Sequence, residues 1–373
     1  MKDIDLLNEF KNYSPGYIVE IYNNGDTREY IYGNKAIYPN VEKVTRNTLY
    51  DIASLTKVYT ATLIYIAYEE KLIDLNDTIY NLDNKFINLK DIKVIDLLSH
   101  NQNIWTDGYL GSVNSREEFY NILYTAYVKE KIPTYVDVHY IILGVILEKL
   151  YGKNYKELCI EKILNKLKLN NTFFDPPANM SASNNYEHME DKIVDNIYPG
   201  LTHDTKGRVA KEFGIYLGHA SIFTTGEDLL KFLKSFFDYS LLKKETIDLM
   251  LKHRNINDLN YKKLKKLYNK EDINEMYNMT LKDNSELHLS KPINNMGVVY
   301  KNIIDKLNDI PIMASDNSIT FSGYTGPMFT IDFEKNIIVV IMCNAIHNSY
   351  YNRKERKEIE VKLSNRVFNS IFK

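Results

Sequence analysis

Strand-like segments lie near both ends of the chain, and most of the sequence between them has helix-like periodicity. Near the start, two alternating apolar segments at 17–22 and 28–32 flank an Asn-Asn-Gly-Asp turn, which predicts a hairpin. Near the end, strand-like segments precede a helical pattern; they span 318–322, 328–332 and 337–343. Both groups of strands can share one sheet if the helices are inserted between them, so the sequence predicts an α/β fold.

The 373 residues are predicted to form a single domain, 1–373, with two parts. We expect an α/β part from 1–75 and 296–373, and a mostly helical part from 76–295 that begins after the helix at 51–72. Helical patterns are predicted at 91–100, 117–128, 138–150, 156–168, 227–240 and 353–372. A polar segment at 176–208 predicts a loop, and a lysine- and asparagine-rich stretch at about 251–290 predicts a surface insertion. Reactive side chains would lie in the cleft between the two parts.

The composition excludes several classes of partner. A formal net charge of −2 predicts no binding to nucleic acid or to an anionic membrane. Neither the first residues nor any later stretch has the apolar run of a signal peptide or a membrane span. Cys159 and Cys343 lie far apart without metal-ligand spacing, which indicates packing roles, a reducing compartment and a cytoplasmic protein. The sequence indicates no cofactor and leaves the oligomeric state open.

A serine and a lysine open the apolar helical segment at 51–72. Ser54 and Lys57 are three residues apart, so both side chains lie on one helix face. A lysine in an apolar setting can assist a serine nucleophile, and the free N–H groups of a helix start favour developing negative charge. A helix N-cap is the alternative role for Ser54. Because the same spacing recurs at 240–243 and 370–373, these two residues alone favour the N-cap.

A second motif changes this balance. Tyr135-Val-Asp137 immediately precedes another apolar helical pattern that contains Leu-Gly-Val-Ile-Leu-Glu at 143–148. Together with Ser54 and Lys57, this order of motifs resembles the serine β-lactamase and penicillin-binding-protein superfamily, whose second motif is Tyr-x-Asn or, in a branch related to class C β-lactamases and family VIII esterases, Tyr-Ser-Asp. Further segments resemble that branch, and they are Leu-Leu-Ser-His at 97–100, His-Asp at 203–204, Gly-His-Ala-Ser-Ile-Phe-Thr-Thr at 218–225 and Asn-Ala-Ile-His at 344–347.

The resemblance covers nearly everything outside 251–290. It implies an antiparallel sheet built from both chain ends, with flanking helices and an inserted helical part. It also implies that Ser54 is acylated and that Lys57 and Tyr135 share the proton transfer. We expect Tyr135 to be the base and Lys57 to stabilise its phenolate, while the reverse assignment stays open. Asp137 would favour a protonated Lys57, and it could also cap the helix that begins at 138.

The third motif differs from the superfamily pattern. Phe321-Ser322-Gly323 stands where the superfamily has Lys-Thr-Gly or His-Thr-Gly. Gly323 would let substrate approach the strand, and Ser322 keeps a small hydroxyl, but Phe321 cannot pair with a substrate carboxylate. We therefore expect a neutral ester or amide as substrate, unless Lys206 or Arg208 on the polar segment supplies a cation.

Other residues are assigned supporting roles. By the resemblance, the backbone N–H groups of Ser54 and Tyr324 form the oxyanion hole. We expect Trp105, in the loop at 101–110, and His203 to support or line the substrate cleft. The separations of His203, His219 and the other candidate ligands match no metal motif, so structural hydrogen bonding is predicted instead.

These features predict a serine hydrolase that cleaves an ester or peptide-like amide in a small-molecule or peptide-like substrate. One alternative is an acyltransferase that passes the same acyl group to an alcohol or amine. Another is a binding or sensory protein on the same fold, which would suit the altered third motif and the Asn-Gln-Asn that follows His100 in place of Thr-Ser-Gly.

Overall fold

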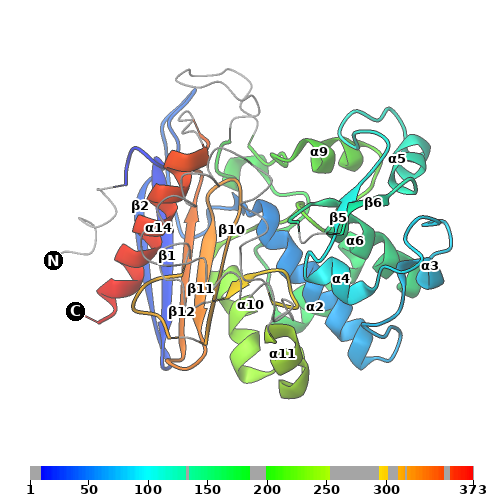
Figure 1. Ribbon diagram of the computed structural model, residues 1–373. Coiled ribbons are helices and arrows are strands. Elements are labelled where there is room, and N and C mark those ends of the chain that lie inside the picture. The colour runs from blue at the N-terminus through cyan, green and yellow to red at the C-terminus, as the bar shows by residue number, and fades with distance from the viewer. Residues whose placement is uncertain are drawn as a thin grey trace, which may run out of the picture.

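The computed structural model of this 373-residue chain describes residues 10–131, 134–184, 199–252, 294–300, 310–315, 317–347 and 353–372. Within them, seven strands form the main sheet in the order β3-β2-β1-β12-β11-β10-β9. Their bounds are β1 Gly16–Asn23, β2 Asp26–Ala36, β3 Glu42–Lys43, β9 Val299–Tyr300, β10 Ser318–Ser322, β11 Met328–Asp332 and β12 Ile337–Cys343. The neighbours are antiparallel, and β1 lies beside β12 with Tyr17 opposite Cys343 (Figure 1). The predicted sheet built from both chain ends is therefore confirmed.

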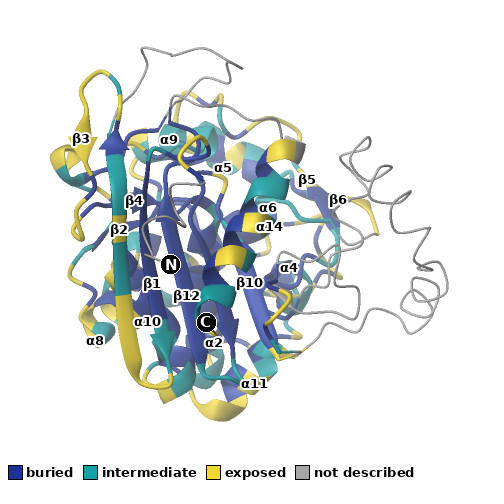
Figure 2. Ribbon diagram, turned by 90° about the vertical axis from the view of Figure 1, so that its left-hand side faces the viewer, coloured by how far each residue is buried: buried dark blue, intermediate teal, exposed yellow. Residues whose placement is uncertain are grey.

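Both faces of the sheet are buried at β12, because alternate side chains of this strand enter two different apolar clusters. Its even-numbered residues from 338 to 342 join a large cluster with α2 (Thr56–Glu69) and α10 (Gly226–Asp238). Its odd-numbered residues from 337 to 343 pack with Leu363, Val367 and Phe368 of α14 (Arg353–Ser370). Figure 1 shows α14 on one side of the sheet and the helical part on the other, and Figure 2 shows α14 lying across the sheet. This layered arrangement confirms the predicted α/β fold class.

The helix that follows Ser54 lies inside the molecule. Every residue of α2 from Thr56 to Ala67 is buried, as expected for a helix that is apolar on nearly all sides. It packs against α6 (Val138–Tyr151), the helix predicted after Tyr135. The remaining helices are α3 Ile79–Leu82, α4 Val94–Leu98, α5 Arg116–Leu123, α7 Tyr155–Cys159, α8 Asn165–Leu167, α9 Thr205–Glu212 and α11 Lys244–Leu251. None of the described helices has the length and apolarity needed to cross a membrane.

Shorter elements complete the described fold. Single turns of 3-10 helix occur at Ala53–Leu55 and Ala178–Met180, and a π-helical turn at Ile160–Leu164 joins α7 to α8. Two small sheets are present in the described residues, with the orders β4-β8-β7 and β5-β6. Their strands are β4 Tyr50–Asp51, β5 Asn103–Trp105, β6 Tyr127–Glu130, β7 Thr172–Phe173 and β8 Phe223–Thr224.

Four sequence predictions differ from the structure. The loop predicted over 101–110 contains β5, whose residues pair with β6. The helix predicted over 117–128 ends at Leu123, because the alternating residues of β6 pair with β5 instead. The helix predicted over 156–168 is interrupted by the π-helical turn. The polar segment at 176–208 was expected to be a loop, yet α9 begins within it at Thr205, where the Asp204 side chain caps the helix. The predicted insertion at 251–290 lies outside the described residues after Lys252.

Candidate active site

Ser54 and Lys57 lie within hydrogen-bonding distance at the start of the buried helix. Ser54 is in the 3-10 turn that leads into α2, and its Oγ accepts a hydrogen bond from Lys57 Nζ at 3.0 Å. The Lys57 side chain is only 2% exposed. The serine hydroxyl therefore lies at the edge of the core, beside an ammonium group that solvent barely reaches.

The turn that carries Ser54 is held in an unusual backbone conformation. Ala53 has a φ of 44°, in the left-handed region that residues with a Cβ rarely adopt. The buried Asp51 carboxylate accepts hydrogen bonds from the Ala53 N–H at 2.8 Å and the His203 N–H at 2.7 Å. Burial raises the pKa of Asp51 to about 6, although the two backbone N–H groups oppose that rise. Asp51 thus fixes the backbone before Ser54, a role that no sequence motif indicated.

Asp137 links Lys57 to a second lysine. Its Oδ1 lies 2.9 Å from Lys57 Nζ, and its Oδ2 lies 3.1 Å from Lys206 Nζ. Asp137 makes no side-chain capping bond to α6, and its own backbone is already helical, so the alternative role of an N-cap is wrong. Burial alone would raise the pKa of Asp137, but Lys57 and the neighbouring cations hold it well below the ordinary value. Asp137 is therefore a carboxylate whose two oxygens each bind an ammonium.

Tyr135 lies against the same lysine. Lys57 Nζ is 4.9 Å from the centroid of the Tyr135 ring. Burial would lower the pKa of Lys57, yet the Asp137 carboxylate and a hydrogen bond with Tyr135 raise it. The Tyr135 ring also packs against His100, with 4.5 Å between ring centroids, and against Phe321, at 6.3 Å. A protonated Lys57 beside a phenol is the arrangement that stabilises a phenolate.

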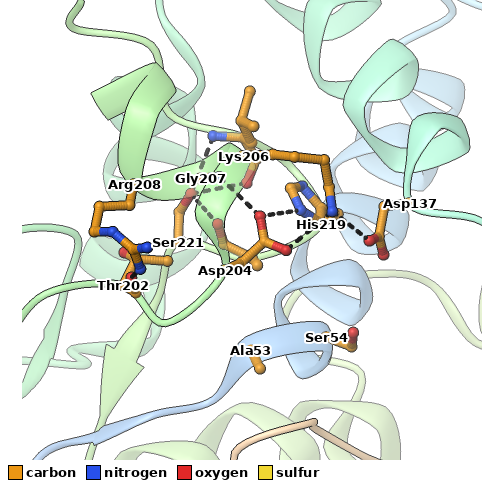
Figure 3. A network of polar contacts seen from close by, with 12 residues as sticks. Ala53, Ser54, Asp137, Thr202, Asp204, Lys206, Gly207, Arg208, His219 and Ser221 are labelled. Carbon is orange, nitrogen blue, oxygen red and sulfur yellow. Dashed lines mark hydrogen bonds and ion pairs between the residues drawn. The ribbon is translucent and has the colours of Figure 1, made fainter. Parts of the chain in front are cut away.

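A network of charges extends from Asp137 to α9, as Figure 3 shows. Lys206 Nζ also lies 3.1 Å from Asp204 Oδ2, and the other oxygen of Asp204 is 2.9 Å from His219 Nε2. The ligand-type atoms of Asp137, Asp204 and His219 lie within 4.8 Å of one another. Lys206 Nζ binds both carboxylates of this cluster. The hydrogen bond of His219 agrees with its predicted structural role.

Arg208, the other cation expected from the polar segment, has different partners. Its Nη1 donates to the carbonyl oxygens of Thr202 at 3.0 Å and His203 at 2.9 Å. In Figure 3 it lies on the opposite side of Asp204 from Asp137. Of the two candidate cations, Lys206 is therefore the one joined to the Ser54 group.

The end of β10 forms a different, less polar side of the site. Phe321 is 8% exposed, and the half-buried Ser322 follows it at the end of the strand. A Cβ on Gly323 would lie 2.5 Å from the Ile52 carbonyl oxygen, so the glycine permits close contact with the segment before Ser54. Tyr324 is 44% exposed, and its ring stacks on His203 with 5.3 Å between centroids. The two backbone N–H groups expected to form the oxyanion hole thus belong to adjoining segments.

Trp105 is not joined to this group by any contact recorded among the described residues. It lies on β5 with 48% of its surface exposed, its Nε1 donates to Asn103, and Lys129 Nζ lies 3.8 Å from its ring. Two buried histidines, His100 and His139, were not singled out from the sequence, and one of them contacts Tyr135. Nδ1 of His100 is 2.8 Å from Nδ1 of His139, and His100 also packs against Tyr135.

Comparisons with known proteins identify relatives of this sequence. The sequence matches the beta-lactamase family over residues 7–362. It is 25% identical over 280 residues to an N-acetylmuramyl-L-alanine amidase of Bacillus subtilis, and the match covers 63% of each protein. It is 23% identical over 363 aligned positions to a putative D-alanyl-D-alanine carboxypeptidase of Salmonella gallinarum, covering 88% of this chain and 77% of the relative. The chain therefore spans less than two thirds of the first of these relatives.

Solved structures share the fold at lower identity. FmtA from Staphylococcus aureus matches with a TM-score of 0.67 and 18% identity, over 97% of this chain and 86% of that protein. A class C beta-lactamase matches with a TM-score of 0.68 and 15% identity, over 98% and 94%. A D-amino acid amidase from Ochrobactrum anthropi matches with a TM-score of 0.67 and 16% identity, over 98% of both chains. Because the family match spans nearly the whole sequence, this chain belongs to the beta-lactamase family.

Proposed function

We propose that this protein is a serine hydrolase that cleaves an ester or peptide-like amide bond through an acyl-enzyme on Ser54. The observation that carries the proposal is the 3.0 Å contact between Ser54 Oγ and the buried Lys57 Nζ, with Asp137 bound to the same ammonium. Family membership supports it, as do relatives named as an amidase and a carboxypeptidase.

In the proposed reaction, Tyr135 accepts the proton of Ser54 while Oγ forms a bond to the substrate carbonyl carbon. The carbonyl oxygen becomes an oxyanion, which the N–H groups of Ser54 and Tyr324 would bind. The tetrahedral intermediate then expels an alcohol or amine, which takes up the proton from Tyr135. A water molecule attacks the acyl-enzyme by the reverse sequence of proton transfers and releases the acid. Lys57 remains protonated throughout and stabilises the phenolate of Tyr135, because Asp137 favours its charged form.

The proposed substrate carries no carboxylate next to the bond that is cleaved. The buried Phe321 offers no charge to such a group, and Lys206 is already bound by two carboxylates. An added carboxylate would have to compete with both of them. A neutral ester or amide with an apolar flank avoids that competition.

The proposal is tested by turnover of a neutral p-nitrophenyl ester. Ser54→Ala should retain less than about 1% of wild-type activity, because loss of a nucleophile usually lowers the rate by 10²-fold or more. Ser240→Ala is the matched control, since Ser240 also begins a Ser-x-x-Lys sequence but lies exposed after α10; its activity should be unchanged. Equal activity in wild type and Ser54→Ala would exclude Ser54 as the nucleophile. Added alcohols or amines in the same assay distinguish hydrolysis from acyl transfer.

We also propose a cytoplasmic location. Both cysteines, Cys159 and Cys343, are buried and unbonded, which fits a reducing compartment. Fractionation of the source cells tests this location, and recovery of the protein outside the cytoplasmic fraction would contradict it.

A further inference from the structure

Lys206 is connected to Lys57, the lysine that contacts Ser54, through the carboxylate of Asp137. It belongs to the first turn of α9, and its side chain is 18% exposed. Its Nζ lies 3.1 Å from Asp137 Oδ2, while the other oxygen of Asp137 lies 2.9 Å from Lys57 Nζ. The two ammonium groups therefore share one carboxylate, and any change in the charge of one alters the electrostatic surroundings of the other.

The position of Lys206 is itself fixed by further contacts. Asp204 binds Lys206 Nζ at 3.1 Å through Oδ2, and it caps α9 by accepting the Gly207 N–H at 2.8 Å through Oδ1. The same Oδ1 is 2.9 Å from Nε2 of the buried His219. A continuous chain of polar contacts thus reaches the nucleophile from the core, as Figure 3 shows in part, and its members in order are His219, Asp204, Lys206, Asp137, Lys57 and Ser54.

We propose that Lys206 is a positioning residue that orients Asp137 toward Lys57 and helps to keep the base of the Ser54 site deprotonated at neutral pH. The inference rests on the proposed function, since it concerns activation of the same serine. A positive charge near a base disfavours protonation of that base, whether the base is a phenolate or an amine. The direct effect of the Lys206 charge therefore has the same sign for Tyr135 and for Lys57, whereas an oriented Asp137 favours a protonated Lys57 and so suits Tyr135 as the base.

Lys206 supplies this charge from a helix, whereas β10 supplies none. Phe321 packs against Tyr135 from the strand and is uncharged. Among the described residues, the titratable groups that face Tyr135 are Lys57 from α2, Asp137 and Tyr140 from the N-terminal part of α6, and His100, two residues after α4. Lys206 itself is faced by Asp137 and Asp204, and burial, which lowers its pKa, is outweighed by those two carboxylates, which raise it. Lys206 thus stays charged at working pH.

The test is the pH dependence of Ser54 phosphonylation by a fluorophosphonate probe, measured by intact mass. Lys206→Gln and Lys206→Met remove the charge, so the midpoint of the rise in rate with pH should move upward by about one pH unit. Lys206→Arg keeps the charge and should leave the midpoint in place. Lys211→Gln is the matched control, because Lys211 is on the same helix but pairs with Asp175 at 2.8 Å; its midpoint should equal that of wild type.

The outcomes separate this inference from the proposed function. If wild type is never labelled by the probe, the proposed function fails. If wild type is labelled but both neutral variants keep its midpoint and only lose rate, Lys206 is merely structural and the inference is overturned. Thermal melting identifies any variant that does not fold. If one neutral variant is unfolded, the midpoint of the other one tests the inference. A midpoint shift in Lys206→Arg as large as that in Lys206→Gln would also overturn the charge argument.

Discussion

Two sides of the candidate site differ in how they are built. On one side, the end of β10 presents the buried ring of Phe321 and a glycine whose missing Cβ allows close backbone contact with Ile52. On the other side, α9 presents Lys206 and Asp204, which connect through Asp137 to Lys57. Packing positions the β10 side, whereas ion pairs position the α9 side. The comparison shows a positive charge on the helix side, at Lys206, and none on the strand side at Phe321.

Asp51 connects the two sides. Its carbonyl oxygen accepts a hydrogen bond from Thr325 Oγ1 at 2.6 Å, just beyond β10. Its carboxylate accepts the N–H of His203, next to the residue that caps α9. The segment that precedes Ser54 is therefore fixed from both directions, and substitutions on either side should have distinguishable effects.

The largest effect is expected where both sides meet, at Tyr135. Tyr135→Phe keeps the ring that packs between His100 and Phe321 but removes the proposed proton acceptor. Single-turnover acylation should slow by about 10²-fold or more, the usual range for loss of a general base. Rapid mixing with a chromogenic ester measures the rate. Acylation at the wild-type rate would show that Lys57 is the base.

Gly323→Ala tests whether the β10 side depends on packing. The added Cβ would lie 2.5 Å from the Ile52 carbonyl oxygen, so the free energy of unfolding should fall by about 1–3 kcal/mol. Gly144→Ala is the control, because its Cβ would meet its nearest neighbour at 3.4 Å. Urea unfolding compares the two variants. Equal stability of Gly323→Ala and wild type would refute the close-contact argument.

Phe321→Lys tests whether the β10 side lacks a useful cation. Acylation by benzylpenicillin, relative to a neutral ester, should rise by about tenfold if one charge-assisted contact of roughly 1.5 kcal/mol is created. Phe321→His should act in the same direction, and Phe321→Leu, which stays apolar, should leave the ratio unchanged. A general loss of packing would lower the rates with both substrates, so it would leave their ratio unchanged. Rapid reaction of wild type with benzylpenicillin would mean that another group binds the carboxylate.

A smaller effect is expected from the pH dependence of stability at Asp51. The folded pKa of about 6 lies above the ordinary value, so the folded state binds the proton more tightly than the unfolded state. Stability from this group is present at low pH and is lost as the pH rises from about 4 to 6. Between pH 5 and pH 7, the free energy of unfolding of wild type should fall by about 1 kcal/mol relative to that of Asp51→Asn.

Asp204→Asn is the control for this measurement. Burial would raise the pKa of Asp204, but His219 and Lys206 lower it overall, so its titration falls below this pH window. Chemical unfolding at the two pH values gives the comparison. A constant difference between wild type and Asp51→Asn would show that Asp51 is ionised throughout the window.

The sequence predicted the parts of the site that local geometry controls. Ser54 and Lys57 meet because an i, i+3 spacing places them on one helix face. The strands β10, β11 and β12 have the predicted bounds, since their apolar segments are separated by clear turns. The ranges of the hairpin and of α6 also follow the predicted patterns closely.

The sequence could not predict contacts that depend on tertiary packing. Lys206 meets Asp137 only because α9 lies beside the start of α6, and no spacing rule connects them. The sequence also could not predict the left-handed backbone of Ala53, because alanine does not favour that conformation. The cap of α9 is different: Asp204 precedes the helix directly, and this N-cap signal was available in the sequence.

The central claim is that Ser54 is the activated nucleophile, and intact mass after treatment with a fluorophosphonate, which phosphonylates such a serine, tests it most directly. We predict one adduct on the wild-type protein, located on Ser54 by peptide mapping, and no adduct on Ser54→Ala. Ser240→Ala should be labelled like wild type. A folded wild-type protein that gains no mass in excess probe, or that carries its adduct on another residue, would contradict the account.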